Sequence, residues 1–473
     1  MFLSEILKDC SKSIEITGFT NDSRKVQPGY AFVCINGSCV DGHKFAKQAN
    51  DNGASVIICE RDLGLYNQLI VEDTKKAYAK MSAEYFGNPA KKLKIIGVTG
   101  TNGKTSTTHI IKSVLEKLGH KAGLIGTISH MVGDEEFPSN NTTPSIYEIN
   151  ELFKKMVDSN CEYAVMEVSS HALDQGRIEG ITFDVGVFTN LTQDHLDYHK
   201  TMDNYLAAKL KLFNATKIAV LNYDDKYFEQ FYNNIDCKKI TYSTVANDAD
   251  YTAKSINYKP NGVDYELVSE NSINRIKMAI PGKFTVYNSL AAAVTLIQLG
   301  FSIDDVSSAI KTVKGVKGRA EIVHTNTDYT IVIDYAHTPD GLLNILNTFK
   351  DCPKNRLVVL FGCGGDRDKS KRSIMGEIAG HNADFVIVTS DNPRSEDPLS
   401  IIKEIVSGMK HIAVPYKIIV NRADAIKFAI DNAQPGDIIV LAGKGHETYQ
   451  ILDYGTIHLD EREIIRDILS QKS

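Results

Sequence analysis

The sequence predicts an α/β protein of three domains. The chain has 473 residues, and a domain typically takes up roughly 150 residues. Through the last third of the chain, short apolar runs alternate with helical patterns, which is typical of α/β domains. The polar, proline-containing segment 88–92 reads as a linker. We therefore predict domains at residues 1–90, 91–318 and 319–473.

Composition narrows the class of protein. Hydrophobic residues make up 42% of the chain and charged residues 24%, as in globular proteins. The net charge of -6 argues against a nucleic-acid partner. No apolar run approaches the ~18 residues of a membrane span, and no signal peptide begins the chain. The 8 cysteines are scattered without a C-x-x-C pair, so we expect a cytoplasmic protein without membrane insertion.

The first two predicted domains contain short apolar runs that are typical of strands. In the first, apolar runs at 31–35 and 54–58 are separated by glycine turns. The second opens with a buried-strand pattern at 93–98, followed by a glycine loop and a helix. In that helix apolar residues recur at helical spacing between Ile110 and Leu118, and Gly119 follows as a stop signal. Further strands are predicted at 163–166 and 218–221.

The last predicted domain reads as a Rossmann-like unit. Strand-like runs alternate with helical patterns, which predicts a parallel sheet with helices on both faces. These strands are expected at 330–333, 357–361, 385–388, 418–420 and 438–441. Because ligands of open α/β sheets bind at the carboxyl ends of strands, the polar loops after these strands are expected to line a site.

The segment Gly100–Ser106 has the composition of a phosphate-binding loop. It stands between a predicted strand and a predicted helix, where backbone N–H groups and the helix N-terminus favour phosphate. Lys104 would reach the terminal phosphates and Thr105 would bind Mg²⁺. Val98 departs from the strict motif, which has glycine there. The segment predicts a P-loop ATPase-type parallel sheet; the alternative is a plain glycine turn with an exposed lysine.

Several residues further along suit a magnesium site beside that loop. Glu167 follows a predicted strand, and His195 and His199 lie in a polar segment after another. Mg²⁺ favours oxygen ligands and substrate phosphates. Alternatively, Glu167 is a solvated strand-end acid, and the histidines are hydrogen-bonded loop residues. Two further polar residues also have a plain structural interpretation: Lys209 as a surface lysine on a helix, and Asn288 as the cap of a helix. A zinc site is not favoured, because no H-E-x-x-H pattern is present.

Three loops of the last domain suit a substrate carboxylate. They span residues 361–368, 390–397 and 442–447, each after a predicted strand. Arg367 and Arg394 are natural partners for a carboxylate, because a guanidinium donates two parallel hydrogen bonds. The alternative is that both arginines form structural ion pairs with neighbouring acids: Asp366, Asp368, Glu396 or Asp397.

Motifs spread over the chain resemble those of the Mur ligase family. They lie between about residue 20 and about residue 460, and the most specific are Gly100–Thr105, Met166–His171, Thr189–His199 and Asp391–Arg394. The resemblance implies a cytoplasmic ATP-dependent amide ligase of peptidoglycan precursor synthesis, and thus of cell-wall biogenesis, cell shape and cell division. The first domain would bind a UDP-muramyl substrate, the second ATP, and the third the incoming amino acid.

The resemblance also implies residues for each ligand. ATP would be bound by Gly100, Thr101, Asn102, Gly103, Lys104, Thr105, Ser106, Asn288 and Arg319. Mg²⁺ would be bound by Thr105, Glu167, His195 and carbamylated Lys209, since carbamylation turns a cation into an oxygen ligand. Catalysis would depend on Lys104, Glu167, His195 and Lys209. The UDP-muramyl dipeptide would contact Ser23, Asn141, Thr142, Thr143, Ser169, Gln175 and Arg177.

The segment Asp391–Arg394 resembles the family's motif for meso-diaminopimelate. Lysine lacks the second carboxylate of diaminopimelate, so it would leave an arginine placed for that carboxylate unpaired, which is costly. The expected contacts are Arg367, Asp391, Asn392, Pro393, Arg394, Gly443 and Glu447, the last through a substrate ammonium. The implied reaction adds meso-diaminopimelate to UDP-N-acetylmuramoyl-L-alanyl-D-glutamate through an acyl phosphate, and we expect a monomer.

The sequence is compatible with two other functions. Folylpolyglutamate synthetases share the phosphate loop, but they would not need Ser23 or the Asp391–Arg394 segment. A P-loop switch or a non-catalytic ATP-binding module is the other alternative. No N-K-x-D guanine motif supports a switch, and the loops of the last domain would then be unexplained.

Overall fold

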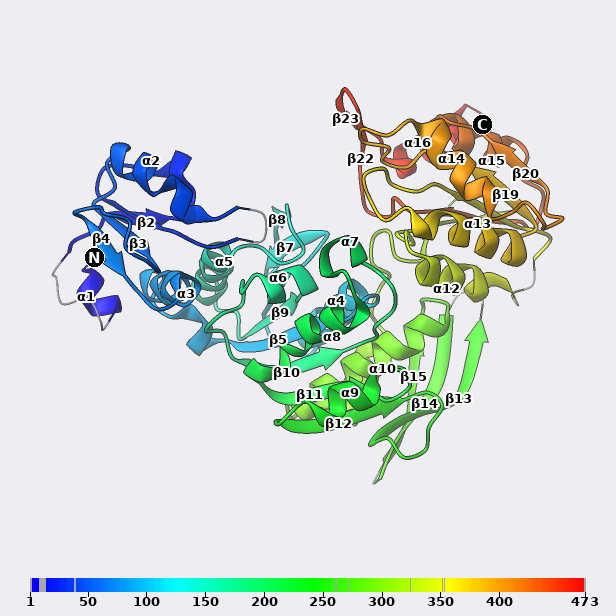
Figure 1. Ribbon diagram of the computed structural model, residues 1–473. Coiled ribbons are helices and arrows are strands. Elements are labelled where there is room, and N and C mark those ends of the chain that lie inside the picture. Colours follow the sequence, from blue (N-terminus) through cyan, green and yellow to red (C-terminus); the bar gives the residue numbers. More distant parts are fainter. Residues whose placement is uncertain are drawn as a thin grey trace.

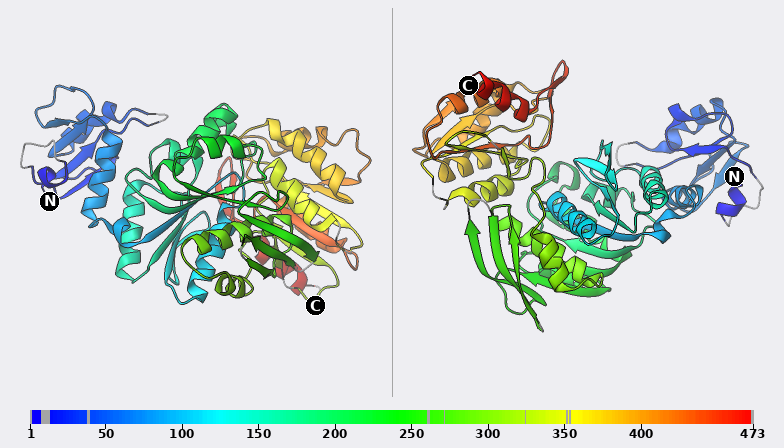
Figure 2. Two further views of the ribbon diagram at one scale, coloured as in Figure 1. Left: turned by 90° about the horizontal axis from the view of Figure 1, so that it is seen from below. Right: turned by 180° about the vertical axis from the view of Figure 1, so that it is seen from behind.

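The computed structural model describes residues 2–7, 14–37, 40–259, 262–270, 272–323, 325–350, 352 and 354–471. Three α/β bodies follow one another along the chain, and the first and last lie on opposite sides of the central one (Figures 1 and 2). Their sheets have 4, 11 and 6 strands. Each sheet falls within one predicted domain, which confirms the α/β class, whereas the boundaries after residues 90 and 318 stay a prediction.

The N-terminal body is built on a small parallel sheet in the order β1-β2-β3-β4. Its strands are β1 (Gly18–Thr20), β2 (Tyr30–Val33), β3 (Val56–Cys59) and β4 (Gln68–Ile70). Its helices are α1 (Leu3–Ile6), α2 (Ala46–Asp51) and α3 (Thr74–Tyr85), with 3-10 turns at Ser23–Lys25 and Gly42–Phe45. The two longer predicted strands thus occur, each shifted by one or two residues.

An aromatic cluster joins this body to the central one. Helix α3 packs against α5 (Ile146–Asp158) of the central body. Phe19 meets Tyr78, Tyr85 and Tyr147 edge to face, with ring centroids 5.4 to 5.6 Å apart. The segment predicted as a linker is an ordered 3-10 turn, Pro89–Lys92, which also contacts α5. The two bodies therefore meet through an apolar contact in addition to the chain connection.

The central sheet has the order β15-β14-β13-β12-β11-β10-β5-β9-β6-β7-β8. Only its middle part, from β13 to β6, is parallel; β7 and β8 at one edge and β14 and β15 at the other pair antiparallel. The strands are β5 (Lys94–Thr99), β6 (Ala122–Ile125), β7 (Ser129–Val132), β8 (Glu135–Pro138), β9 (Tyr163–Glu167), β10 (Phe183–Phe188), β11 (Thr216–Asn222), β12 (Lys238–Ser243), β13 (Tyr251–Lys259), β14 (Gly262–Ser269) and β15 (Ser272–Met278).

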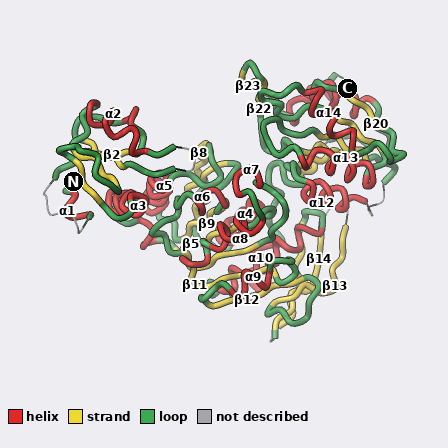
Figure 3. Tube along the Cα trace, in the orientation of Figure 1, coloured by secondary structure: helices red, strands yellow, loops and turns green. Residues whose placement is uncertain are grey.

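Helices cover both faces of this sheet (Figure 3). Separate apolar cores lie on the two faces, one formed with α4, α10 and α11 and the other with α5 and α8. The helices are α4 (Lys104–Lys117), α5, α6 (Ser170–Asp174), α7 (Leu196–His199), α8 (Met202–Leu210), α9 (Phe228–Asn233), α10 (Lys283–Gln298) and α11 (Ile303–Ile310), with a 3-10 turn at Phe213–Ala215. Strand β5 ends directly before the phosphate loop, between β9 and β10.

The C-terminal sheet has the order β16-β17-β21-β18-β19-β20 and is parallel except for β16. The strands are β16 (Glu321–Val323), β17 (Thr330–Asp334), β18 (Leu357–Phe361), β19 (Phe385–Val388), β20 (Tyr416–Ile418), β21 (Ile438–Ala442), and the hairpin β22 (Tyr449–Leu452) and β23 (Gly455–His458). The helices are α12 (Pro339–Lys350), α13 (Ser370–Asn382), α14 (Pro398–Ser407), α15 (Arg422–Asp431) and α16 (Glu461–Ser470).

Four of the five predicted strands of this domain match closely. The fifth, predicted at 418–420, is β20 and begins two residues earlier, at Tyr416. The side chains of this edge strand are exposed, so the apolar pattern marks only its end. Within the described part of the chain, no helix combines the length and apolar character needed to cross a membrane.

Candidate active site

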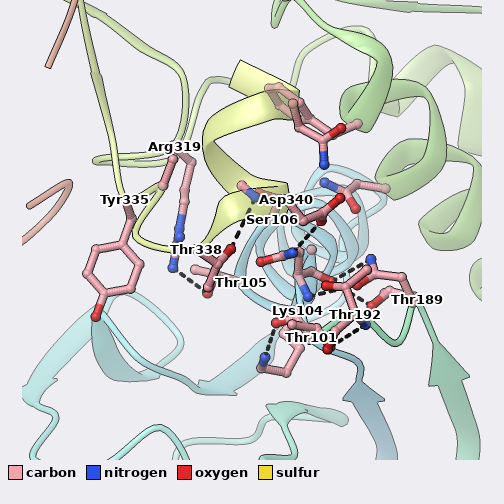
Figure 4. Close-up of a pocket in the computed structure, with 18 of the residues that line it drawn as sticks. Thr101, Lys104, Thr105, Ser106, Thr189, Thr192, Arg319, Tyr335, Thr338 and Asp340 are labelled. Carbon is pink, nitrogen blue, oxygen red and sulfur yellow. Dashed lines mark hydrogen bonds between the residues drawn. The ribbon is translucent and has the colours of Figure 1, made fainter. Parts of the chain in front are cut away.

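A cavity of about 410 Å³ lies between the central and C-terminal bodies. The phosphate loop forms one wall, and Asp334–Gly341 with Arg319 forms the opposite wall (Figure 4). The two walls touch directly: Asn102 donates from Nδ2 to Asp340 at 2.7 Å, and Arg319 donates from Nη2 to the Thr105 hydroxyl at 3.2 Å. The sequence predicts the phosphate loop and Arg319 as nucleotide contacts, but it gives no sign of the Asn102–Asp340 contact.

Glycine is required at two positions of the phosphate loop. A Cβ on Gly100 would lie 1.9 Å from the Thr189 hydroxyl, and one on Gly103 would lie 2.5 Å from the Asn288 side-chain oxygen. Gly103 also has a φ of +87°, which L side chains rarely adopt. Helix α4 begins at the next residue, so its N-terminus and the loop N–H groups suit an anion in the cavity.

Lys104 is folded back over its own loop. Its ammonium donates to the carbonyls of Gly100 at 2.9 Å and Thr101 at 2.8 Å. Burial lowers the pKa of this lysine. A phosphate in the cavity would offer charged acceptors in place of these carbonyls.

Glu167 is fully buried beside the loop, so it is not a solvated strand-end acid. Its carboxylate accepts hydrogen bonds from the Thr105 hydroxyl at 2.9 Å, the Thr127 hydroxyl at 2.9 Å and the Thr127 N–H at 2.8 Å. Hard oxygen donors next to a phosphate site fit Mg²⁺, which keeps waters and bridges phosphates. No group of three or more His, Cys, Asp or Glu side chains in the described ranges is arranged as a metal site by itself.

The histidines differ in their surroundings. His195 has a φ of 55° just before α7, and its ring meets that of His171 edge to face at 4.8 Å. Burial lowers the pKa of His195 to about 4, so its imidazole is neutral at pH 7, the form that binds metals. His199 instead forms a structural hydrogen bond with the Ser170 hydroxyl at 2.9 Å.

Lys209 is 1% exposed, so it is not a surface lysine. Its ammonium donates to the Gly100 carbonyl at 2.8 Å and lies 4.6 Å from the centre of the Tyr205 ring. Burial, aided by the charge of Lys104, holds the pKa of Lys209 well below its usual value. A neutral amine is the form that reacts with carbon dioxide, so this environment suits the predicted carbamylation.

Asn288 lies inside α10 and does not cap it; Gly282 stands at the N-cap. Its side-chain oxygen accepts from the Thr107 hydroxyl at 3.4 Å and faces Gly103. Arg319 approaches from the other wall, with its guanidinium carbon 4.5 Å from the centre of the Tyr335 ring. Both residues therefore lie at the cavity, as expected of nucleotide contacts.

Most of the residues predicted to bind the muramyl peptide surround one loop beside Glu167. Thr143 donates from its hydroxyl to the Glu167 carbonyl at 2.8 Å and accepts from the Ser169 N–H at 3.0 Å. Arg177 donates to the Thr143 carbonyl at 2.7 Å and to Gln175 at 2.7 and 3.0 Å.

The neighbouring Thr142 joins the same network, because its hydroxyl lies 3.0 Å from that of Thr127. Asn141 is exposed beside it. Ser23 belongs to the N-terminal body, where its hydroxyl donates to Gln48 at 2.9 Å. The structure therefore brings together every predicted muramyl contact except Ser23.

The three predicted amino-acid loops meet at the carboxyl ends of the adjacent strands β21, β18 and β19. Gly365 donates from its N–H to the Asn392 carbonyl at 2.9 Å, and Arg394 donates from Nη1 to the Gly365 carbonyl at 2.8 Å. Gly443, with a φ of +112°, lies so close to Asp391 that a Cβ would be 2.5 Å from its carboxylate. Pro393 is buried against Gly365.

Arg367 and Arg394 do not form the structural ion pairs that remained an alternative. Neither guanidinium lies within 4.0 Å of an acidic side chain among the described residues. The neighbouring acids are engaged elsewhere: Glu396 pairs with Arg372 at 2.9 Å, Asp366 accepts from Ser395, Asp368 from Ser370, and Asp397 caps α14. Arg372, which sequence reasoning missed, thus leaves both predicted arginines available to a substrate carboxylate.

Comparison with known proteins identifies the class to which this site belongs. The model described as "Mur ligase family, catalytic domain" matches residues 15–89, "Mur ligase middle domain" matches 98–296, and "Mur ligase, glutamate ligase domain" matches 318–445. The chain belongs to the Mur ligase family, whose members are ATP-dependent ligases.

Within that family, relatives with one particular name are similar over almost their whole length. The chain is 46% identical over 473 aligned residues to "UDP-N-acetylmuramoyl-L-alanyl-D-glutamate--2,6-diaminopimelate ligase" of Clostridium botulinum, with 98% of this chain and 97% of the relative covered. A solved structure of a protein with that name is 32% identical, with a TM-score of 0.73 over 100% of this chain and 99% of the other.

A folylpolyglutamate synthase of Mycobacterium tuberculosis, solved with ADP and AMPPCP, is also similar. It is 17% identical, with a TM-score of 0.64 over 78% of this chain and 92% of that chain. At this identity the similarity shows a shared fold alone.

Proposed function

We propose that this protein adds meso-diaminopimelate to UDP-N-acetylmuramoyl-L-alanyl-D-glutamate, with conversion of ATP to ADP and phosphate. The names of relatives similar over nearly the full chain support this ligase function. The proposal that the amino acid is diaminopimelate rests on one observation, the surroundings of the Arg367 and Arg394 side chains. In the described part of the chain, neither guanidinium group has an acidic partner. Both lie in loops at the carboxyl ends of the strands, where the incoming amino acid would bind.

The reaction has two steps. An oxygen of the D-glutamate γ-carboxylate attacks the γ-phosphorus of ATP, which forms an acyl phosphate and releases ADP. The neutral amine of diaminopimelate then attacks the acyl carbon, the C–O bond to phosphate breaks, and an amide and phosphate result. Lys104 and the N-terminus of α4 would stabilise charge on the transferred phosphoryl group, as is usual in phosphoryl transfer.

The oxygen donors at the phosphate loop fit a magnesium ion, which would neutralise phosphate charge. We propose that Thr105, Glu167, His195 and carbamylated Lys209 hold it. The muramyl dipeptide would lie along the loop of Asn141, Thr142 and Thr143, near Ser169, Gln175 and Arg177, with its uridine end at Ser23. We further propose that the protein acts as a cytoplasmic monomer, without nucleic-acid partners.

The test is phosphate release by purified protein with ATP, Mg²⁺ and UDP-N-acetylmuramoyl-L-alanyl-D-glutamate, with either meso-diaminopimelate or L-lysine added. Turnover with diaminopimelate and little with lysine is expected. Turnover that favours lysine would keep the ligase but overturn the assigned role of Arg394. No turnover with either, together with turnover of a folate and glutamate, would support the folylpolyglutamate alternative instead.

A further inference from the structure

Lys444 is completely buried in the last of the three amino-acid loops, and sequence reasoning gave it no role. A buried ammonium is costly unless it is paired and hydrogen-bonded. Its Nζ donates to the Glu447 carboxylate oxygen Oε2 at 2.6 Å and to the Asn392 side-chain oxygen at 2.9 Å. Both partners are among the residues predicted to contact the incoming amino acid.

These contacts fix the orientation of the Asn392 amide. Its oxygen receives a second donor, the N–H of Ile451, at 3.0 Å. With two donors on the oxygen, Nδ2 has to lie on the other side, where it donates to Glu447 Oε2 at 3.0 Å. Lys444, Asn392 and Glu447 thus form a closed triangle of hydrogen bonds between two loops.

The two carboxylate oxygens of Glu447 differ in the hydrogen bonds that they accept. Oε2 accepts from both Lys444 and Asn392, whereas the hydrogen bond that Oε1 accepts within the described ranges is a long one, 3.4 Å, from the Tyr335 hydroxyl. Oε1 therefore retains capacity for a further donor, and a substrate ammonium carries three N–H groups.

The same triangle fixes the loop that carries Arg394. Ile451 donates to the Asn392 side chain and accepts from the Arg394 N–H at 3.1 Å, so one residue of β22 contacts both. Arg394 itself has a φ of 53°, a conformation that its surroundings have to maintain. A displaced Asn392 would therefore also displace the guanidinium proposed to bind the substrate carboxylate.

We propose that Lys444 is a positioning residue for the incoming amino acid. It holds Glu447 so that Oε1 remains available to an ammonium of the substrate, and it holds Asn392 and thereby the Arg394 loop, without touching the substrate itself. This inference rests on the proposed ligase function, because it concerns the amino-acid site of that reaction.

The test measures initial rates of phosphate release against diaminopimelate and, separately, against ATP. Lys444→Met is expected to raise the KM for diaminopimelate about tenfold or more, as the loss of a charge-assisted contact does. The KM for ATP should change less than about twofold, because none of Lys444, Asn392 and Glu447 lines the phosphate cavity and the one link to its wall is the long Tyr335–Glu447 hydrogen bond. Lys112→Met is the control, since Lys112 is also buried and ion-paired, with Glu116, but lies in the second half of α4, outside the amino-acid loops.

A double variant distinguishes a role of Lys444 in positioning Glu447 from a role in stabilising the fold alone. Lys444→Met added to Glu447→Gln should raise the KM for diaminopimelate much less than it does in the wild-type background, because Lys444 acts through Glu447. This double variant has no unpaired buried carboxylate, so it also decides the question if Lys444→Met does not fold.

Three results would overturn the proposal: an unchanged KM for diaminopimelate with only a lower melting temperature, equal rises in both KM values, or fully multiplicative effects in the double variant. A wild-type protein inactive with diaminopimelate would instead overturn the proposed function, and this inference with it.

Discussion

Lys104 and Lys209 donate to the same backbone carbonyl, that of Gly100, at 2.9 and 2.8 Å. Two ammonium groups on one neutral acceptor repel each other, and burial lowers the pKa of both. One of the two lysines is therefore predisposed to lose its charge. Lys209, whose pKa is lowered well below its usual value, is the better candidate.

From this arrangement we predict that catalysis requires the amine of Lys209. Lys209→Arg should lower kcat at least about 100-fold, because a guanidinium keeps its charge and does not form a carbamate, and electrostatic groups at reacting phosphates typically contribute this much. Rates of phosphate release provide the measurement. In wild-type protein, ¹³C NMR with labelled bicarbonate should give a carbamate signal that Lys209→Arg lacks; a fully active arginine variant would rule out the modification as a requirement.

The Thr105–Glu167 contact predicts how activity depends on magnesium. Glu167→Gln keeps a similar shape but removes the charge, so a divalent cation loses one of its two proposed anionic ligands, the other being carbamylated Lys209. We expect kcat to fall about 100- to 1,000-fold and half-maximal activity to require more Mg²⁺. The measurement is the rate as a function of MgCl₂ concentration. Thr127→Val removes one hydrogen bond to the same carboxylate, and a smaller effect is expected there; an unchanged magnesium requirement in Glu167→Gln would contradict the assigned site.

Arg394 predicts the choice between diaminopimelate and lysine. Arg394→Ala should lower kcat/KM for diaminopimelate about 10- to 1,000-fold and leave the low rate with lysine nearly unchanged, since only diaminopimelate has the second carboxylate. Competition between the two amino acids at fixed ATP measures the ratio. Arg372→Lys is the structural comparison: it weakens the pairing with Glu396 and should lower stability more than specificity. Equal losses with both amino acids in Arg394→Ala would argue against this role.

Much of the fold follows from patterns local to the sequence. Strands β18 and β19 match their predicted limits, because buried parallel strands are continuous apolar runs between polar loops. In the observed sheet β9 and β10 flank β5, so the carboxyl ends of these three parallel strands lie side by side, and with them Glu167 and the phosphate loop. The Thr105 hydroxyl donates to the Glu167 carboxylate at 2.9 Å, and a shared role of the two residues in binding Mg²⁺ stays a prediction.

The rest depends on contacts between distant segments. At one antiparallel edge of the central sheet, the side chains of β15 alternate between more and less exposed positions, and no local pattern places such a strand on a parallel sheet. Asn102 and Asp340 are 238 residues apart. Lys444 illustrates the same limit, since a lone lysine in a glycine loop is usually exposed, and only its neighbours Asn392 and Glu447 make its burial tolerable.

Buried histidines predict that the protein loses stability in mild acid. His109, on α4, has its pKa lowered to about 4 by burial, and its Nε2 has no hydrogen-bond partner among the described residues. In the unfolded chain a histidine has a pKa of about 6.5, so between about pH 6.5 and 4 the unfolded state binds a proton that the folded state does not. The free energy of unfolding therefore falls as the pH falls through this window, and the histidine contributes no such loss above it.

His109→Phe removes this titration. The stability of the variant relative to wild type should improve by about 2 kcal/mol at most on going from pH 7 to pH 4.5. Urea denaturation followed by circular dichroism at several pH values measures the difference. His381→Phe, at an exposed position near the end of α13, is the matched control substitution. Parallel pH profiles for wild type and His109→Phe would mean that His109 ionises alike in the folded and unfolded states.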